Sequence, residues 1–194
     1  MSGVDEVGRG CLAGPVVAAA VILSLDNIPK GINDSKKLSA KQRERLDKEI
    51  RASAVAFAIG MGDVTEIDTI NIFQSSKKAM LRAIAALKPS ADFLLLDGNF
   101  KIESPLPQRF IIGGDRVSVS IAAASIIAKV YRDALMRELD LQYPGYYLAQ
   151  NKGYGSPDHR VALEAIGPSE IHRKSFTWTP VRDLRQSHLP KEIL

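Results

Sequence analysis

The segment Val4-Asp5-Glu6-Val7-Gly8-Arg9-Gly10 places two adjacent carboxylates directly before a Gly-Arg-Gly turn. Neighbouring side chains of a strand point to opposite faces, so an Asp-Glu pair within a strand puts one acid into the core unless something compensates it. A divalent cation is such a compensation. Gly8 and Gly10 let backbone N–H groups approach a ligand closely, and Arg9 adds a charge that matches phosphate geometry. The segment therefore predicts half of a metal site that holds a phosphodiester, although a solvated hairpin turn has the same pattern.

The size and composition are those of a single globular domain. The chain has 194 residues, of which 45% are hydrophobic and 25% are charged, and this predicts one compact domain with a full core. The longest apolar run, Pro15 to Leu23, has the length of a strand and is too short to span a membrane. Asp5 and Glu6 stand where a signal peptide would carry positive charge, so we expect a cytoplasmic protein with no membrane partner.

The cysteine content, the net charge and the positions of the histidines exclude some kinds of site and mildly favour one kind of partner. The single cysteine, Cys11, excludes an intramolecular disulfide and a Cys-rich zinc site, and its use is typical of a buried small residue in a reducing compartment. The formal net charge of +4 favours a polyanionic partner only mildly. The three histidines lie near the carboxyl terminus and match no nucleophile motif.

Apolar spacing and turn residues predict alternating strands and helices. The run Pro15–Leu23 is expected to be a buried strand that forms a hairpin with the first strand. Ser39 is a good N-cap for the helix that follows it. The other expected elements are helices 40–52, 63–87, 118–141 and 157–166, and strands 54–61, 93–96 and 110–112.

Two further carboxylates stand at the ends of predicted elements. Asp97 ends a short buried strand, which is where α/β sheets place ligands, although Asp-Gly is also a common turn. Asp115 precedes the most helical stretch of the chain, residues 118–141, where it can equally be a capping acid. Together with Asp5 and Glu6 they form a set of acids without clustered His or Cys, which favours Mg²⁺ or Mn²⁺ over zinc. Two such ions can activate water and stabilise the leaving oxygen in phosphodiester cleavage.

Two loops carry candidate substrate contacts. The loop 31–39 contains Lys36 and Lys37, which can reach a phosphate or simply be solvated. The segment 143–156 is aromatic, basic and glycine-rich, so its tyrosines can stack on a base or sugar or pack at the surface.

Taken in register, the motifs of this chain closely resemble those of ribonuclease HII, the type 2 ribonuclease H. The resemblance runs from Gly3 to about Val181. It rests on Asp5-Glu6-x-Gly8-Arg9-Gly10, Leu12-Ala13-Gly14-Pro15-Val16-Val17, Asn33-Asp34-Ser35-Lys36, Asp97-Gly98-Asn99, Gly114-Asp115, Ala122-Ala123-Ala124-Ser125-Ile126-Ile127-Ala128-Lys129-Val130-x-Arg132-Asp133, Gly153-Tyr154-Gly155 and His172-Arg173-x-Ser175-Phe176.

The resemblance implies the fold and domain organisation. The fold class is α/β, a ribonuclease H-like mixed sheet flanked by helices, with a helical C-terminal part. Residues 1–194 would form a single ribonuclease H-like catalytic domain, in which about 143–194 make up the loop-rich and helical C-terminal part. We expect a monomer.

The resemblance also implies the reaction. The substrates would be RNA/DNA hybrids and duplex DNA that carries a single ribonucleotide, cut on the 5′ side of the ribonucleotide to leave 3′-hydroxyl and 5′-phosphate ends. By position, the metal-binding acids of the family fall on Asp5, Glu6, Asp97 and Asp115, which would hold two ions, Mg²⁺ or Mn²⁺.

The substrate contacts follow in the same way. Gly8, Arg9 and Gly10 match the motif that contacts the 2′-hydroxyl and nearby phosphates, and Tyr154 matches the tyrosine that stacks on the following deoxyribose. Only a 2′-hydroxyl distinguishes the two sugars, and a close backbone turn can hydrogen-bond it. Lys36 matches a phosphate-contacting position, with Asn33 and Ser35 as its helpers.

The chain departs from the family pattern at three places. Gly113 stands where many members have a lysine, which weakens a phosphate contact and makes Arg116 a candidate replacement. Ser156 replaces a common threonine and keeps the hydroxyl. Only two residues precede the first strand, so we expect its amino-terminal end to fray or lack a partner.

Two other functions are compatible with parts of the pattern. The first is a carboxylate-metal DNA nuclease or strand-transfer protein on the same fold, because fold alone does not determine the substrate. The second is a catalytically silent nucleic-acid-binding module, but four uncompensated carboxylates would repel a phosphate.

Overall fold

The computed structural model describes residues 1–180 of the chain. Residues 181–194 lie outside the described part, and with them the segment Ser187–Leu194, in which the sequence shows no partner motif. Within residues 1–180, no helix is both long and apolar enough to cross a membrane.

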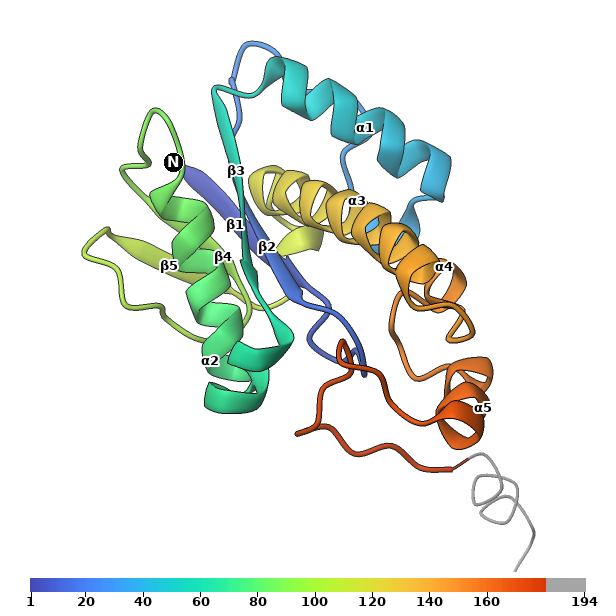
Figure 1. Ribbon diagram of the computed structural model, residues 1–194. Helices are drawn as coiled ribbons and strands as arrows, with labels where there is room; N and C mark the ends of the chain where they lie inside the picture. The colour runs from blue at the N-terminus through green and yellow to red at the C-terminus, as the bar shows by residue number, and fades with distance from the viewer. Residues whose placement is uncertain (181–194) are drawn as a thin grey trace, which may run out of the picture.

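A mixed five-stranded sheet forms the centre of the molecule (Figure 1), in the order β3-β2-β1-β4-β5. Antiparallel pairing joins the first three strands, and parallel pairing joins β1 to β4 and β4 to β5. The strands are β1 (Ser2–Val7), β2 (Val16–Ile22), β3 (Ala56–Gly62), β4 (Leu94–Asp97) and β5 (Gln108–Ile111). The predicted hairpin of the first two strands is therefore confirmed.

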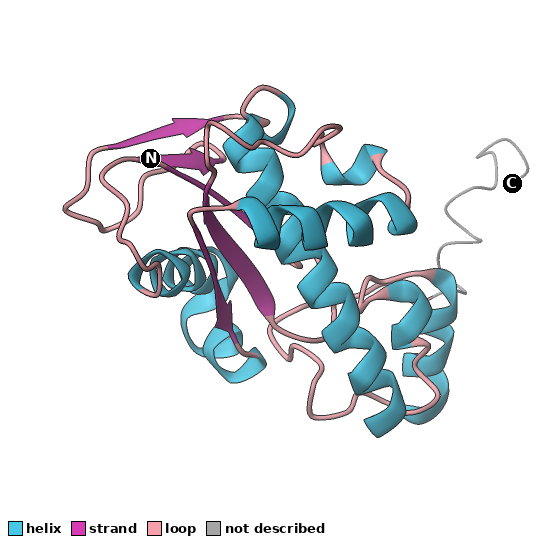
Figure 2. Ribbon diagram, turned by 90° about the horizontal axis from the view of Figure 1, so that it is seen from above, coloured by secondary structure: helices cyan, strands magenta, loops and turns pink. Residues whose placement is uncertain are grey.

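Helices cover both faces of this sheet (Figure 2). One face packs against α2, and the other packs against α3, with α1 lying on α3. The α-helices are α1 (Ala40–Ser53), α2 (Val64–Ala85), α3 (Val119–Gln142), α4 (Leu148–Asn151) and α5 (Pro157–Ile166); the short 3-10 helices are η1 (Ser35–Lys37) and η2 (Gly114–Arg116). The α/β fold class expected from the sequence is confirmed.

Strand β2 is buried on both faces, as its continuous apolar run predicts. Val16, Ala18 and Ala20 join the α2 side of the core, whereas Val17 and Ala19 join the α1–α3 side. Because β2 lies between two other strands under helices on both sides, each of its side chains is removed from water.

Gly3 allows α3 to approach the sheet closely. A Cβ at this position would lie 2.1 Å from the backbone carbon of Ser120, in the first turn of α3. This close approach brings the amino-terminal half of α3 against β1, the strand that carries Asp5 and Glu6.

The expectation that the first strand frays at its amino-terminal end is wrong. Ser2 is buried, lies opposite Leu94 in β4, and donates its N–H to the Phe93 carbonyl at 2.8 Å. The Met1 ammonium also contacts Asp92 at 2.7 Å. The parallel neighbour β4 supplies the partner that the local sequence does not reveal.

Helix α2 differs from a regular continuous helix. Asn71 has φ 69° and ψ 163°, and its side chain accepts the Gln74 N–H at 3.1 Å, so it caps a second helical segment. The apolar spacing of Ile70, Phe73 and Met80 continues across the kink, which explains why the pattern predicts one helix.

The C-terminal part has a small core of its own, which also contains Leu12 and Ala13 from the loop between β1 and β2. Leu12 N–H donates to the Gly153 carbonyl at 2.8 Å, and Ala13 forms an isolated β-bridge with His172. This joins residues after 142 to the Gly-Arg-Gly turn. The assignment of 1–194 to one domain stays a prediction.

Candidate active site

Residues from six segments line a cavity of about 200 Å³ at the carboxyl ends of β1 and β4. All four predicted acids contribute to it, and so do Ser35, Lys36 and Tyr154; the other lining residues are Val7, Ser125 and Lys129. The remaining predicted contacts lie around the cavity. Arg9 reaches Glu6, Gly8 is buried in the adjacent turn, and Gly10 and Asn33 are exposed.

Parallel pairing explains why Asp5 and Asp97, which are 92 residues apart in sequence, meet. Val4 lies opposite Leu96 in the β1–β4 ladder, so Asp5 and Asp97 leave the sheet at the same edge. Asp97 Oδ1 accepts the Gly114 N–H at 2.6 Å, which draws η2 and its Asp115 towards the strand ends. A Cβ at position 114 would lie 2.5 Å from Ile121 Cδ1, so a larger residue here would have to displace the end of that side chain.

Burial and mutual repulsion disfavour the ionised form of Asp5, Glu6 and Asp115. The pKa of Asp5 is raised well above its usual value by burial, then by Glu6 and Asp97, against hydrogen bonds from Ser125 and the Glu6 N–H. Burial also raises the pKa of Glu6, although Arg9 opposes it. The pKa of Asp115 is raised by burial and by the neighbouring Asp34 and Asp97.

The donor set fits a hard divalent cation. Glu6 Oε2 is buried and has no hydrogen-bond partner, and the clustered carboxylate oxygens are ligands that Mg²⁺ and Mn²⁺ prefer. Among residues 1–180, however, no three or more acidic, His or Cys side chains converge into a ready-made metal shell. Asp97 instead accepts a backbone N–H, and Asp5 is held by Ser125 and the Glu6 N–H. The metal-binding role of the four acids therefore stays a prediction.

The turn after β1 is held by two buried arginines. Arg173 donates to the Gly8, Arg9 and Gly14 carbonyls at 2.6–3.0 Å. Arg132, with no exposed surface, donates to the carbonyls of Pro15, Lys152 and Ala13 at 2.9, 2.7 and 3.1 Å.

Gly8 has φ +93°, and a Cβ there would lie 2.2 Å from Arg132 Nε. This glycine is thus required for packing, whatever it contributes to a ligand.

Arg9 lies between the acids and an aromatic pair. Its guanidinium contacts Glu6 Oε1 at 3.3 Å, and it lies 5.9 Å from the ring centres of both Phe73 and Phe100. The two rings pack edge to face at 5.0 Å, and Lys77 Nζ lies 4.9 Å from the Phe73 ring. The side chain of Arg9 is therefore oriented before any ligand binds.

The loop 33–36 reaches the cavity through Ser35 and Lys36. Ser35 Oγ hydrogen-bonds Ser125 Oγ of α3 at 2.8 Å, while the Asp34 side chain caps η1 by accepting the Lys36 N–H at 3.0 Å. Arg116 Nε lies 3.7 Å from Asp34 Oδ2. Arg116, the candidate replacement for a lysine at position 113, therefore pairs with Asp34.

Sequence reasoning assigned no role to three residues of this site. Ser125 and Lys129 lie within a quoted family motif, and their spacing of four residues places both on one face of α3. Asp34 also lies within a quoted motif, but only the structure places it beside Asp115. Helical spacing could have revealed the first two.

The family model for ribonuclease HII matches residues 2–179. The chain belongs to the ribonuclease HII family. The ribonuclease HII of Bacillus thuringiensis (strain Al Hakam) is 53% identical over 186 residues, which is 96% of this chain and 71% of that protein. The ribonuclease HII of Bacillus anthracis is 53% identical over 184 residues, covering 95% and 70%.

Solved structures show the same fold. Ribonuclease H2 from Pyrococcus horikoshii OT3 has a TM-score of 0.75 at 24% identity, covering 96% of this chain and 97% of that one. RNase HII in the PCNA:RNase HII complex from Archaeoglobus fulgidus has a TM-score of 0.77 at 26% identity, covering 94% and 98%. Bst-RNase HIII in complex with Mn²⁺ has a TM-score of 0.63 at 21% identity, covering 86% and 62%.

Membership of the ribonuclease HII family confirms the resemblance drawn from the motifs. The chain is a type 2 ribonuclease H, a metal-dependent enzyme that acts on RNA/DNA hybrids. A catalytically silent binding module is not supported by this membership.

Proposed function

We propose that this enzyme cuts the RNA strand of hybrids and also cuts duplex DNA on the 5′ side of a single embedded ribonucleotide. In this proposal Asp5, Glu6, Asp97 and Asp115 hold two Mg²⁺ or Mn²⁺ ions, and the products carry 3′-hydroxyl and 5′-phosphate ends. The observation that supports it most is the convergence of these acids on one cavity, where Glu6 Oε2 has no partner.

The ions, when bound, would activate the attacking water and stabilise the departing 3′-oxygen. The acids of the chain would hold them, and Lys36 and Lys129 on the cavity wall would balance the phosphate charge. Lys129 is already paired with Asp133 at 2.8 Å, which keeps its ammonium at the wall. Ser125 would orient the carboxylate of Asp5.

Two elements would read the RNA-to-DNA junction. The turn Gly8-Arg9-Gly10 would contact the 2′-hydroxyl, and Tyr154 would stack on the following deoxyribose. Tyr154 is 40% exposed at the cavity, with Lys129 Nζ and the Arg132 guanidinium each 6.0 Å from its ring. Asn33 and Ser35 would assist Lys36 at a phosphate, and the enzyme would act as a monomer.

The test uses labelled DNA duplexes with one ribonucleotide, beside an all-DNA duplex and a uniform RNA/DNA hybrid. Each substrate is incubated with Mg²⁺, with Mn²⁺ and with chelator. We expect metal-dependent cutting 5′ of the ribonucleotide and an intact all-DNA control. Cutting of the all-DNA duplex would favour the DNA nuclease alternative, and an uncut single-ribonucleotide duplex beside a cut hybrid would remove junction recognition from the proposal.

A further inference from the structure

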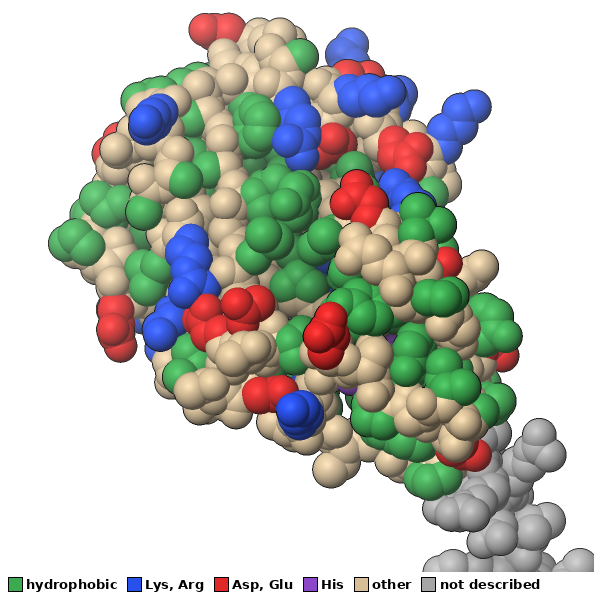
Figure 3. All heavy atoms as spheres, viewed as in Figure 1, with side chains coloured by type: hydrophobic (Ala, Val, Ile, Leu, Met, Phe, Trp, Pro, Cys, Tyr) green, Lys and Arg blue, Asp and Glu red, His purple; other side chains and the backbone are tan. Residues whose placement is uncertain are grey.

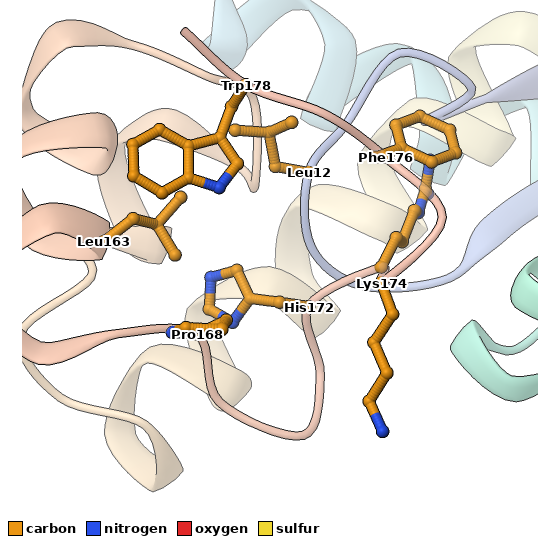
Figure 4. Close-up of a pocket in the computed structure, with 8 residues that line it drawn as sticks. Leu12, Leu163, Pro168, His172, Lys174, Phe176 and Trp178 are labelled. Atoms are coloured by element: carbon orange, nitrogen blue, oxygen red, sulfur yellow. The ribbon is translucent and has the colours of Figure 1, made fainter. Parts of the chain in front are cut away.

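Two buried histidines form a pair behind the Tyr154 loop. His159 lies in α5 and His172 in the segment after it, and their exposed fractions are 0% and 4%. His172 also lines a cavity of about 130 Å³. Figure 4 shows its ring beside Pro168, on the side of the cavity that carries Leu163. Neither histidine takes part in the proposed chemistry.

The hydrogen bonds determine which nitrogen carries each proton. His159 Nδ1 lies 2.9 Å from the Tyr154 carbonyl oxygen, which can only accept, so Nδ1 carries the hydrogen. In the neutral ring, His159 Nε2 is then an acceptor, and His172 Nε2, at 3.0 Å, must donate to it. His172 Nδ1 is left as an acceptor for the N–H and hydroxyl of Ser169, at 3.0 and 2.8 Å.

These hydrogen bonds form a relay from Ser169 through His172 and His159 to the Tyr154 carbonyl. The relay requires both imidazole rings to be neutral. A second proton on His159 would set its Nε2–H against the Nε2–H of His172 across 3.0 Å, and a second proton on His172 would set its Nδ1–H against the Ser169 N–H, also across 3.0 Å. The surroundings also disfavour an imidazolium, because burial lowers the pKa of both residues, and that of His172 to about 4. The Tyr146 ring packs 4.6 Å from the His172 ring and seals the pair on one side.

The relay ends at the backbone of the proposed sugar-stacking residue. The Tyr154 carbonyl accepts from His159, while the preceding Gly153 carbonyl accepts the Leu12 N–H of the Gly8–Pro15 loop. At its other end, His172 forms a β-bridge with Ala13 of that loop. The pair therefore lies between the two elements that would read the junction.

We propose that His159 is a positioning residue whose Nδ1–H bond holds Tyr154 in register with the Gly8-Arg9-Gly10 turn and so sets selectivity for the RNA-to-DNA junction, and that His172 acts by fixing the tautomer of His159. This inference rests on the proposed function. Its requirement is the bond from His159 Nδ1 to the Tyr154 carbonyl, because within residues 1–180 that bond alone joins a side chain of the histidine pair to Tyr154.

Two substitutions of His159 each keep one of its two side-chain hydrogen bonds and remove the other. The amide nitrogen of Asn takes the place of Nδ1 and that of Gln the place of Nε2, so His159→Asn keeps the bond to Tyr154 and His159→Gln loses it. The readout is the ratio of kcat/KM on a single-ribonucleotide duplex to kcat/KM on a uniform hybrid. We expect His159→Gln to lower this ratio by about tenfold, and His159→Asn to leave it within about twofold. Leu46→Ala, in the distant α1, controls for lost stability alone.

The outcomes distinguish the inference from the function on which it rests. If the unmodified enzyme cuts the single-ribonucleotide duplex but His159→Gln and Leu46→Ala change both substrates equally, the relay is only structural and the inference fails. If the unmodified enzyme does not cut that duplex, the proposed function itself fails. Imidazole ¹⁵N shifts of the unmodified protein give a further test, since a hydrogen on His159 Nε2 or on His172 Nδ1 would overturn the inference without any variant.

Discussion

Asp5 is the residue at which burial and charge oppose each other most strongly. It is 5% exposed and lies beside two other acids, so the protein without metal carries a destabilising carboxylate that a cation would compensate. The strand places it there because Val4 and Asp5 must point to opposite faces, and Val4 belongs to the α2 side of the core.

Asp5→Asn should reduce cleavage of an RNA/DNA hybrid by roughly two to three orders of magnitude while substrate binding is retained. Single-turnover assays and fluorescence anisotropy measure the two effects. The same variant should unfold at a higher temperature than the unmodified protein in chelator, because a neutral amide removes the repulsion that raises the pKa of Asp5. Substantial remaining activity would show that the four-acid assignment is wrong.

Tyr154→Ala should impair cutting at a single embedded ribonucleotide more than it impairs cutting of a uniform hybrid or lowers stability. The ring is exposed on the cavity side and its loss removes the proposed stacking surface. Tyr154→Phe is the matched control, since it keeps the ring and loses only the hydroxyl, whose pKa of about 12 keeps it neutral in any usual assay. Equal losses of selectivity and stability in the alanine variant would return Tyr154 to a packing role.

At the scale of elements, the loop between β1 and β2 depends on distant side chains for its shape. Its carbonyls at Gly8, Arg9 and Gly14 accept from Arg173, which lies about 160 residues away along the chain. Replacing that guanidinium leaves several carbonyls without donors, and each buried unpaired group costs about 1–3 kcal/mol.

Arg173→Met should therefore lower the free energy of unfolding by at least about 3 kcal/mol and also weaken hybrid cleavage. Urea unfolding measures the first effect. Arg45→Met is the control, because Arg45 makes an exposed i,i+4 pair with Glu49 worth about 0.3–0.5 kcal/mol. A change no larger than that of the control would mean that the turn holds its shape without Arg173.

At the scale of the whole molecule, the buried groups make stability depend on pH in opposing ways. The folded-state pKa values of His159 and His172 are lowered, so the unfolded chain binds more protons between pH 6.5 and about 4, and their contribution is lost as the pH falls through this window. The raised carboxyl pKa values of Asp5, Glu6 and Asp115 act in the opposite direction in the metal-free protein.

A comparison of the unmodified protein with the His172→Gln variant separates the effect of the histidines on stability from the effect of the carboxyl groups. The difference in unfolding free energy between the two proteins should shrink as the pH is lowered from 7 towards 4, because the variant lacks one of the groups that must protonate. The charged neighbours are already engaged: Arg160 with the Gly155 carbonyl, Arg173 with loop carbonyls, and Glu170 with the Tyr143 hydroxyl. A difference that stays constant with pH would contradict a neutral, buried His172.

The face of the molecule drawn in Figure 3 carries hydrophobic as well as charged side chains. Figure 3 shows a strip of hydrophobic side chains in the middle of one face, where Figure 1 places β3, with acidic and basic groups interspersed around it. The proposed substrate contacts gather instead at the carboxyl ends of β1 and β4.

The sequence by itself determined most of the secondary structure elements and singled out the four acids that line the cavity. Local signals suffice for these: Ser39 and Gln42 form the capping box of α1, and an apolar run followed by Asp-Gly marks the end of β4. Local signals missed α4, which is a single turn, and the kink at Asn71.

Only the tertiary structure decided the strand order and the contents of the cavity. Parallel pairing of β1 with β4 brings Asp97 to Asp5, the 90-residue contact from Ser35 to Ser125 brings in the loop, and the histidine pair joins α5 to the segment after it. None of these contacts leaves a periodic or local signal, because each depends on which distant surfaces are buried together. The motifs therefore identify the candidate reacting groups, and the long-range packing determines how they are held.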